Sequence, residues 1–142
     1  MDKCVLDTDI LSEYLKGHDS VVIGRAAQYA HEHRVFSFTS VTVYEIVYGL
    51  QVKGATAQPQ KVLAWLRQND EIAPVAEDYI AAASFRAKAS QQGAPLELTD
   101  CLIAAVALRL ARPLVTGNTD DFRAIQKTGV KLSIDNWRKP LH

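Results

Sequence analysis

V-L-D-T-D-I-L, the stretch from Val5 to Leu11, joins a short apolar run directly to a helical one and has two carboxylates at the junction. Lys3–Leu6 is predicted to be a short buried strand. Apolar residues then recur at helical spacing from Ile10 to Leu15, and Gly17 is expected to end that helix. The stretch therefore predicts one strand followed at once by one helix.

The same alternation continues along the chain. Further strands are predicted at Val35–Phe38, Ile72–Val75, Pro113–Thr116 and Val130–Ile134. Helices are predicted at Val43–Leu50, Val62–Leu66, Tyr79–Ala89, Leu98–Leu110 and Thr119–Ile125. Strands that alternate with helices favour a parallel sheet, so the predicted fold class is α/β.

Size and composition are those of an ordinary globular domain. The 142 residues are 48% hydrophobic and 23% charged, which favours one domain spanning residues 1–142. The loop-like stretch Lys53–Pro59 is too short to be a linker between domains. A formal net charge of zero excludes a strongly basic nucleic-acid coat protein, so any contact with nucleic acid must be local.

Cysteine usage and apolar run lengths predict a reduced, cytoplasmic protein with no membrane association. Cys4 and Cys101 are far apart in the sequence and neither belongs to a C-x-x-C motif, which favours free core thiols over a disulfide or a zinc site. The N-terminal apolar run stops at Asp7, too early for a signal peptide. The run Cys101–Leu108 is too short to span a bilayer.

Carboxylates follow the predicted strands or open the predicted helices. In a parallel sheet, ligands bind beyond the carboxyl ends of the strands, where loops lead into helix N-termini. The acidic residues expected at this edge are Asp7, Glu45, Asp100 and the pair Asp120-Asp121.

Helix capping is the alternative explanation for most of these acids. Asp9 could cap the first helix, Thr42 and Glu45 have capping-box spacing, and Asp100 follows a possible Thr99 cap. Capping is not expected to account for Asp7. That residue follows a strand destined for the sheet centre, where an unpaired carboxylate is costly.

Clustering of Asp7, Glu45 and Asp100 would raise their pKa values unless a cation lies among them. Oxygen ligands suit Mg²⁺ or Mn²⁺, whereas zinc would call for His or Cys. A metal held by carboxylates can activate water for attack on a phosphodiester. The cluster therefore predicts metal-dependent phosphoryl chemistry.

Four motifs in order carry a family resemblance. They are V-L-D-T-D-I-L at Val5–Leu11, S-V-T-V-Y-E-I-V-Y-G-L at Ser40–Leu50, L-T-D-C-L-I-A-A-V-A at Leu98–Ala107 and L-V-T-G-N-T-D-D-F at Leu114–Phe122. With these motifs the chain resembles PIN-domain ribonucleases, specifically the VapC toxins of toxin–antitoxin modules. The resemblance implies a PIN-like three-layer fold, with a central, mostly parallel sheet flanked by helices.

The resemblance also implies functional roles. It implies a Mg²⁺-dependent endoribonuclease, with Mn²⁺ as a substitute. Asp7 and Asp100 would hold the metal, and Glu45 would complete the acidic cluster. Thr8 and Thr116 match supporting positions. The fourth acidic position is assigned to Asp121, beside Asn118, and Asp120 is expected to be a surface acid. Where many relatives have Asn, this chain has Asp9.

Partners follow from the same resemblance. It implies an RNA substrate, with transfer RNA among the candidates. It also implies a VapB-like antitoxin, and the protein would contact DNA only through that antitoxin. The apolar helices Ile10–Leu15 and Val43–Leu50 are expected to leave a groove for an amphipathic antitoxin segment. A homodimer is also expected.

Two rival functions stay open. A haloacid-dehalogenase-like phosphatase would use Asp7 as nucleophile in the D-x-D of Asp7 and Asp9. Against this function, the chain has no lysine at the end of a predicted strand, and Glu45 and Asp100 would have no role. The other rival is a PIN-like domain that has lost catalysis and only binds RNA or a partner.

Three further features of the sequence bear on function. His31-Glu32-His33 is expected to be a solvated helix end, and Trp65 and Trp137 are expected to pack in the fold. From Arg123 to His142 the chain has five basic residues and one acidic residue, a net charge of +4. A mildly basic surface around an acidic site would suit RNA phosphates.

Overall fold

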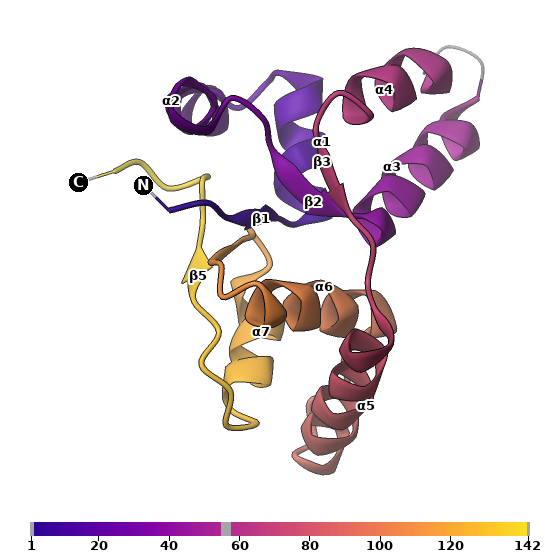
Figure 1. Cartoon of the computed structure of the whole chain (residues 1–142), viewed down its shortest axis with the longest axis vertical. Helices are drawn as coiled ribbons and strands as arrows, with labels where there is room; N and C mark the ends of the chain where they lie inside the picture. Colours follow the sequence, from indigo (N-terminus) through magenta and orange to yellow (C-terminus); the bar gives the residue numbers. More distant parts are fainter. Residues whose placement is uncertain (1, 55–57, 142) are drawn as a thin grey trace.

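The computed structural model describes residues 2–54 and 58–141 and has three layers, with a parallel sheet between two groups of helices (Figure 1). The strands are β1 (Val5–Leu6), β2 (Ser37–Thr39), β3 (Asp70–Ile72), β4 (Leu114–Val115) and β5 (Ile134–Asp135). The helices are α1 (Thr8–Lys16), α2 (Ser20–His33), α3 (Ser40–Lys53), α4 (Pro59–Leu66), α5 (Ala76–Gln91), α6 (Leu98–Arg109) and α7 (Thr119–Gln126).

Every strand pairing is parallel, as the alternation of strands and helices predicts. β4 pairs with both β1 and β5, while β2 pairs with β3 and also contacts β1. β1, β4 and β5 therefore form one sheet and β2 and β3 another. Contacts between β1 and β2 place the two side by side, giving the order β3, β2, β1, β4, β5. The order reverses between β1 and β4, so the carboxyl ends of these two strands form the crevice where α/β folds bind ligands.

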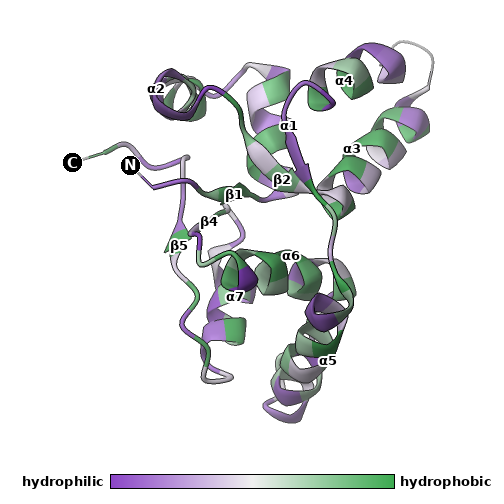
Figure 2. Ribbon diagram, viewed as in Figure 1, coloured by the Kyte–Doolittle hydropathy of each residue, from purple (hydrophilic) through white to green (hydrophobic). Residues whose placement is uncertain are grey.

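Two hydrophobic clusters cover the two faces of the sheet. Val5 and Leu114 belong to the cluster formed with α5, α6 and α7, whereas Leu6 and Val115 belong to the cluster formed with α1, α2 and α3. Neighbouring residues of a strand point to opposite faces of the sheet, so the two apolar residues of β1, and likewise those of β4, contribute one side chain to each cluster. Figure 2 shows α6 as largely apolar around its circumference, consistent with its buried position.

Three elements differ from the sequence-based prediction. The sequence predicts α2 only at its solvated end, His31–His33, because its buried residues Val22, Ala26 and Tyr29 alternate with polar ones and with Gly24. β3 begins two residues earlier than predicted and is mostly exposed, since it is an edge strand. β5 is Ile134–Asp135, not Val130–Ile134, because only this end pairs with β4.

The expectations for the cysteines and tryptophans are confirmed. Cys4 and Cys101 are free and buried, Trp137 is in the core, and Trp65 packs against the rings of Tyr14 and Phe36. The stretch Lys53–Pro59 lies between α3 and α4, and residues 55–57 within it lie outside the described residues. Within residues 2–54 and 58–141, no helix is long and apolar enough to cross a membrane.

Candidate active site

Asp7 lies between the end of β1 and the start of α1, with only 5% of its surface exposed. Its Oδ1 accepts a hydrogen bond from Thr8 N at 2.8 Å, and its Oδ2 accepts one from Thr116 Oγ1 at 2.8 Å. Asp7 is therefore the N-cap of α1, which corrects the expectation that Asp9 would cap this helix and that capping would not involve Asp7. The Thr116 contact spans from β1 to the end of β4 and places Asp7 in the crevice between them.

The surroundings of Asp7 disfavour its ionised form. Burial and, next, the carboxylates of Asp9 and Asp100 raise the pKa of Asp7 to about 8, although the hydrogen bonds from Thr116 and Thr8 lower it. A carboxyl group held in this way gains most from a nearby cation, because a cation offsets both the lost hydration and the like charges.

Glu45 reaches the site from the second turn of α3. The Thr8 hydroxyl donates a hydrogen bond to Glu45 Oε1 at 2.7 Å and lies 3.0 Å from the hydroxyl of the fully buried Thr42. The predicted capping box of Thr42 and Glu45 is wrong, because Thr39 is the N-cap and accepts from Thr42 N. Thr8, which follows Asp7 in the chain, instead binds the Glu45 carboxylate and contacts the hydroxyl of Thr42.

Asp100 lies in the first turn of α6. Helix α6 follows α5 rather than a strand, and its N-cap is Glu97, so the expected Thr99 cap is wrong. Burial and, next, the charges of Asp121 and Glu45 raise the pKa of Asp100 to about 6. Asp100 therefore lies within electrostatic reach of acids that come from α3 and α7.

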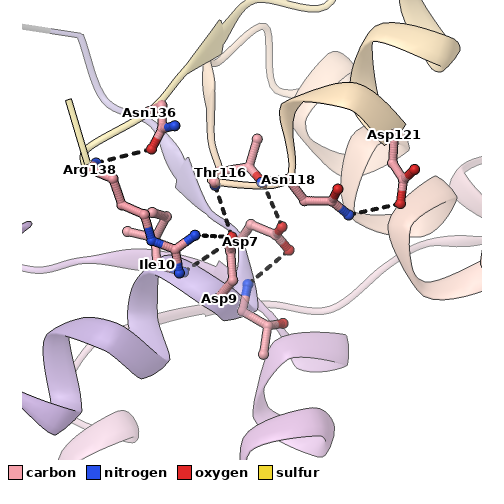
Figure 3. Close-up of polar contacts among 10 residues, drawn as sticks. Asp7, Asp9, Ile10, Thr116, Asn118, Asp121, Asn136 and Arg138 are labelled. Atoms are coloured by element: carbon pink, nitrogen blue, oxygen red, sulfur yellow. Dashed lines mark hydrogen bonds and ion pairs between the residues drawn. The ribbon is translucent and has the colours of Figure 1, made fainter.

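The last acidic pair divides as the sequence analysis expects. Asp121 accepts a hydrogen bond from Asn118 Nδ2 at 2.8 Å, and Asn118 N donates to Thr116 Oγ1 at 2.9 Å (Figure 3). The side chain of Asp120 is 94% exposed and lies 3.6 Å from Arg123. Asp121 is thus connected through Asn118 and Thr116 to Asp7, whereas Asp120 lies on the surface.

Asp9, Gly117 and Arg138 form a further part of the site that the motifs did not reveal. Asp9 Oδ2 accepts a hydrogen bond from Gly117 N at 2.9 Å, and Arg138 Nη1 lies 3.4 Å from the same oxygen (Figure 3). In the sequence Arg138 stands out only as one member of the basic C-terminal stretch. No local pattern could reveal its contact, because it lies 129 residues from Asp9 in the sequence.

The donor set fits a magnesium-like ion bound partly through water. Among residues 2–54 and 58–141, no three His, Cys, Asp or Glu side chains converge closely enough to hold an ion by themselves. Mg²⁺ keeps several of its water ligands and often binds proteins through one or two carboxylates. Asp7 and Asp100, two carboxylates with raised pKa values at one crevice, suit that mode of binding.

Comparisons with known proteins agree with this architecture. The PIN domain family model matches residues 4–128. No curated protein sequence matches the chain. Among solved structures, VapBC from Salmonella typhimurium bound to DNA has a TM-score of 0.79 and 22% identity, covering 96% of this chain and 99% of that one.

Two more solved structures share the fold. VapBC2 from Rickettsia felis, bound to a DNA fragment from its promoter, has a TM-score of 0.77 and 24% identity, covering 94% of this chain and 97% of that one. VapBC-1 from nontypeable Haemophilus influenzae has a TM-score of 0.77 and 23% identity, covering 95% and 98%. With the family model matching nearly the whole chain and the acids gathered at the β1–β4 crevice, this protein belongs to the PIN domain family.

Proposed function

We propose that the protein is a Mg²⁺-dependent endoribonuclease and the toxin of a VapBC-type module. PIN domains as a family are nucleases. The observation that carries the proposal is the gathering of Asp7, Glu45, Asp100 and Asp121 from four separate helix starts at one crevice. A bound cation would offset the burial and like charge that raise the pKa values of Asp7 and Asp100.

The chain's own residues would each have a defined task. Asp7 and Asp100 would hold the ion, with Mn²⁺ as a substitute, and Thr116 and Thr8 N keep the Asp7 carboxylate in place. Glu45, fixed through Oε1 by Thr8, would orient the attacking water with its other oxygen. The ion, when bound, supplies an electrophile for the phosphodiester and lowers the pKa of the water.

RNA cleavage with matched variants tests this proposal. Purified protein is incubated with total cellular RNA in Mg²⁺, in Mn²⁺ and in excess chelator, and the cut ends are sequenced. Cleavage is expected with either metal and is expected to stop with chelator or in Asp100→Asn. The control is Asp120→Asn, which removes an equal charge from the surface and is expected to cleave as the wild type does. Full activity in chelator would contradict the proposal.

An antitoxin site is proposed at the groove between α1, α3 and α4. A cavity of about 300 Å³ is lined there by the apolar residues Leu15, Ile46, Leu50 and Val62, and Glu45 lies on its wall. An amphipathic segment of a VapB-like partner would fill this groove and bring a basic side chain to Glu45. The protein would then contact DNA only through the antitoxin.

Co-expression with the adjacent reading frame tests the partner. A stable complex with suppressed RNA cleavage is expected, and Leu50→Glu is expected to weaken the complex while leaving cleavage intact. Exposed Gln28→Glu in α2 is the control. If the adjacent product neither binds nor inhibits, the toxin assignment falls and the nuclease assignment remains.

A homodimer is proposed through exposed apolar side chains of α3 and α5. Tyr44, Tyr48 and Val52 repeat every four residues along α3 and are 65%, 59% and 68% exposed. The rings of Tyr44 and Tyr48 stack with their centroids 6.1 Å apart. Ile80 on α5 is 72% exposed. Exposed apolar stripes of this kind are typical of protein interfaces.

The rival functions are less well supported. The charged groups acting most strongly on Asp7 are the acids Asp9 and Asp100, whereas an aspartyl-phosphate mechanism needs a balancing lysine. A binding module without catalysis would not need Asp7 and Asp100 in an environment that disfavours their charge. Because its proposed substrate is cellular RNA, we propose that the protein acts in the cytoplasm.

A further inference from the structure

The C-terminal segment is held against the molecule by Arg25 of α2. Arg25 Nη2 lies 2.7 Å from Asp135 Oδ2, and Arg25 Nη1 donates to the carbonyl oxygens of Asn136 at 3.0 Å and Lys139 at 3.1 Å. The Arg25 side chain is only 11% exposed. One side chain therefore contacts both ends of the segment 135–139. We call this set of contacts the Arg25 clamp, and it fixes the path of the backbone between the two ends.

This clamp places Arg138 over the turn that follows β4. Arg138 N donates to Asn136 Oδ1 at 3.0 Å, and the guanidinium reaches Asp9 and Gly117 (Figure 3). A Cβ atom at Gly117 would lie 2.9 Å from Arg138 Cζ and 2.7 Å from Asp9 Oδ2, and closer still to Arg138 Nη1. The close approach of the guanidinium therefore depends on glycine at position 117.

The Arg138 guanidinium has hydrogen-bonding capacity to spare. Its one polar side-chain contact within the described part of the chain is the 3.4 Å contact with Asp9, and its side chain is 40% exposed. Charge-assisted hydrogen bonds are usually about 2.7–2.9 Å long, and a guanidinium has five N–H donors. Asp9 thus holds Arg138 beside the acidic site without using most of its donors.

A basic cavity adjoins Arg138. It has a volume of about 600 Å³, and its walls include the bases Arg25, Arg123 and Lys139 and one acid, Asp135, which pairs with Arg25. Arg123 also lies 3.6 Å from the exposed Asp120. Arg25 Nε is buried and makes no hydrogen bond within the described residues. The clamp, the cavity and Arg138 together form a cationic surface next to a carboxylate-rich crevice that would otherwise repel a polyanion.

We infer that the C-terminal segment forms an RNA-backbone subsite, in which Arg138 binds the phosphate next to the cleaved bond and Lys139 and Arg123 bind the following phosphates in the cavity. This inference rests on the proposed ribonuclease function. A planar guanidinium binds phosphate oxygens in pairs, which suits Arg138 for the position nearest the reaction. The carboxylate of Asp9 would hold Arg138 until RNA binds.

RNA binding as a function of salt tests the subsite. A fluorescein-labelled 15-nucleotide single-stranded RNA of mixed sequence is titrated in Mg²⁺ with Asp100→Asn protein, so that the RNA stays intact. Adding Arg138→Ala is expected to weaken binding several-fold and to reduce the slope of log K against log salt by about 0.7, as for one lost phosphate contact on a single strand. Adding Arg138→Lys is expected to retain the slope.

Arg67→Ala in the same background is the matched control. It also removes one exposed arginine, but Arg67 is the C-cap of α4, on the opposite side of the molecule from the C-terminal segment in Figure 1. Its salt slope is expected to stay within experimental error. An equal reduction in both variants would overturn the subsite, because it would mean that only net charge matters.

The variant Asp9→Asn distinguishes two roles for Arg138, namely binding an RNA phosphate and neutralising the charge of Asp9. If Arg138 binds phosphate, Arg138→Ala weakens RNA binding equally whether or not Asp9→Asn is also present. If the loss disappears in the Asp9→Asn background, Arg138 only balances Asp9 and the inference is wrong. Wild-type protein that cleaves RNA while Arg138→Ala leaves the slope unchanged would refute the subsite alone. Absence of cleavage with an Arg138-dependent slope would refute the proposed catalysis alone.

Discussion

At the scale of single residues, Asp7 has two roles that conflict in the metal-free protein. As the N-cap of α1 it favours a negative charge, because a carboxylate at a helix N-terminus interacts well with the helix dipole. Burial and the neighbouring acids oppose that charge and raise its pKa to about 8. A bound cation would resolve this conflict, because it offsets both the burial and the like charges.

The stability of the metal-free protein is expected to fall as pH rises. The Asp7 carboxyl has an ordinary pKa of 3.8 and a pKa of about 8 in the fold. Between these values the unfolded chain has released the proton and the folded chain retains it, so the free energy of unfolding decreases with pH and levels off above about pH 8. Urea unfolding in chelator at pH 5, 6, 7 and 8 measures this.

The variants Asp7→Asn and Asp120→Asn assign the effect. Asp7→Asn removes the titrating group and is expected to flatten the pH dependence, leaving the smaller contribution of Asp100 below about pH 6. Asp120→Asn is expected to retain the wild-type slope, because its side chain is 94% exposed. Identical slopes in wild type and Asp7→Asn would show that Asp7 ionises normally.

Thr116 is expected to act through Asp7. Thr116→Val removes the hydroxyl that donates to Asp7 Oδ2 and accepts from Asn118 N, and the loss of a group that orients a metal ligand typically costs about 10–100-fold in activity or metal affinity. Thr116→Ser is expected to restore activity. The measurement is RNA cleavage rate against Mg²⁺ concentration, and a Thr116→Val enzyme with wild-type metal dependence would contradict the role.

At the scale of elements, strands of two or three residues make few backbone hydrogen bonds, so side-chain contacts hold the segments that connect them. The best example is the contact between α2 and the C-terminal segment, where Arg25 binds Asp135 and two backbone carbonyls. β5 itself contributes only two residues to the sheet. The position of the chain after β5 therefore depends more on Arg25 than on strand pairing.

Arg25→Ala is expected to lower the free energy of unfolding by about 2 kcal/mol, since hydrogen bonds to charged groups contribute about 1.5–3 kcal/mol and the partner Asp135 is 46% exposed. Urea or thermal unfolding measures the loss. Arg67→Ala is the control and is expected to change stability by less than about 0.5 kcal/mol, as exposed substitutions usually do. Equal losses in the two variants would exclude a specific clamp.

At the scale of the whole molecule, one crevice and two exposed surfaces share the same few helices. The start of α3 supplies Thr42 and Glu45 to the site, one side of α3 lines the α1–α4 groove, and another exposes Tyr44, Tyr48 and Val52. Substrate and antitoxin would thus both reach Glu45 of this helix, whereas a second copy of the chain would contact its exposed tyrosines.

Tyr48→Glu is expected to convert the proposed dimer to a monomer at micromolar concentration, because it places a charge in the middle of the apolar stripe. Sedimentation equilibrium measures the mass, and exposed Gln28→Glu in α2 is the control. Persistence of the dimer in Tyr48→Glu would place the interface elsewhere, and a monomeric wild type would contradict the dimer altogether.

The sequence by itself determined the α/β class and most helices, and it predicted which acids would lie near the crevice. Hydrophobic periodicity and strand-end carboxylates are local patterns, and the parallel sheet edge converts them into a cluster without further information. The choice of Asp121 over Asp120 came from the family resemblance, and the structure places the two in different surroundings.

Only the tertiary structure decided which side chain caps which helix and what surrounds each acid. Asp7 rather than Asp9 caps α1, and Thr39 rather than Thr42 caps α3, because pairing of β1 with β4 and of β2 with β3 determines where each strand ends. Arg138 reaches Asp9 across 129 residues through the Arg25 clamp, a contact that no local pattern encodes. Long-range contacts of this kind depend on packing, which a single sequence does not display.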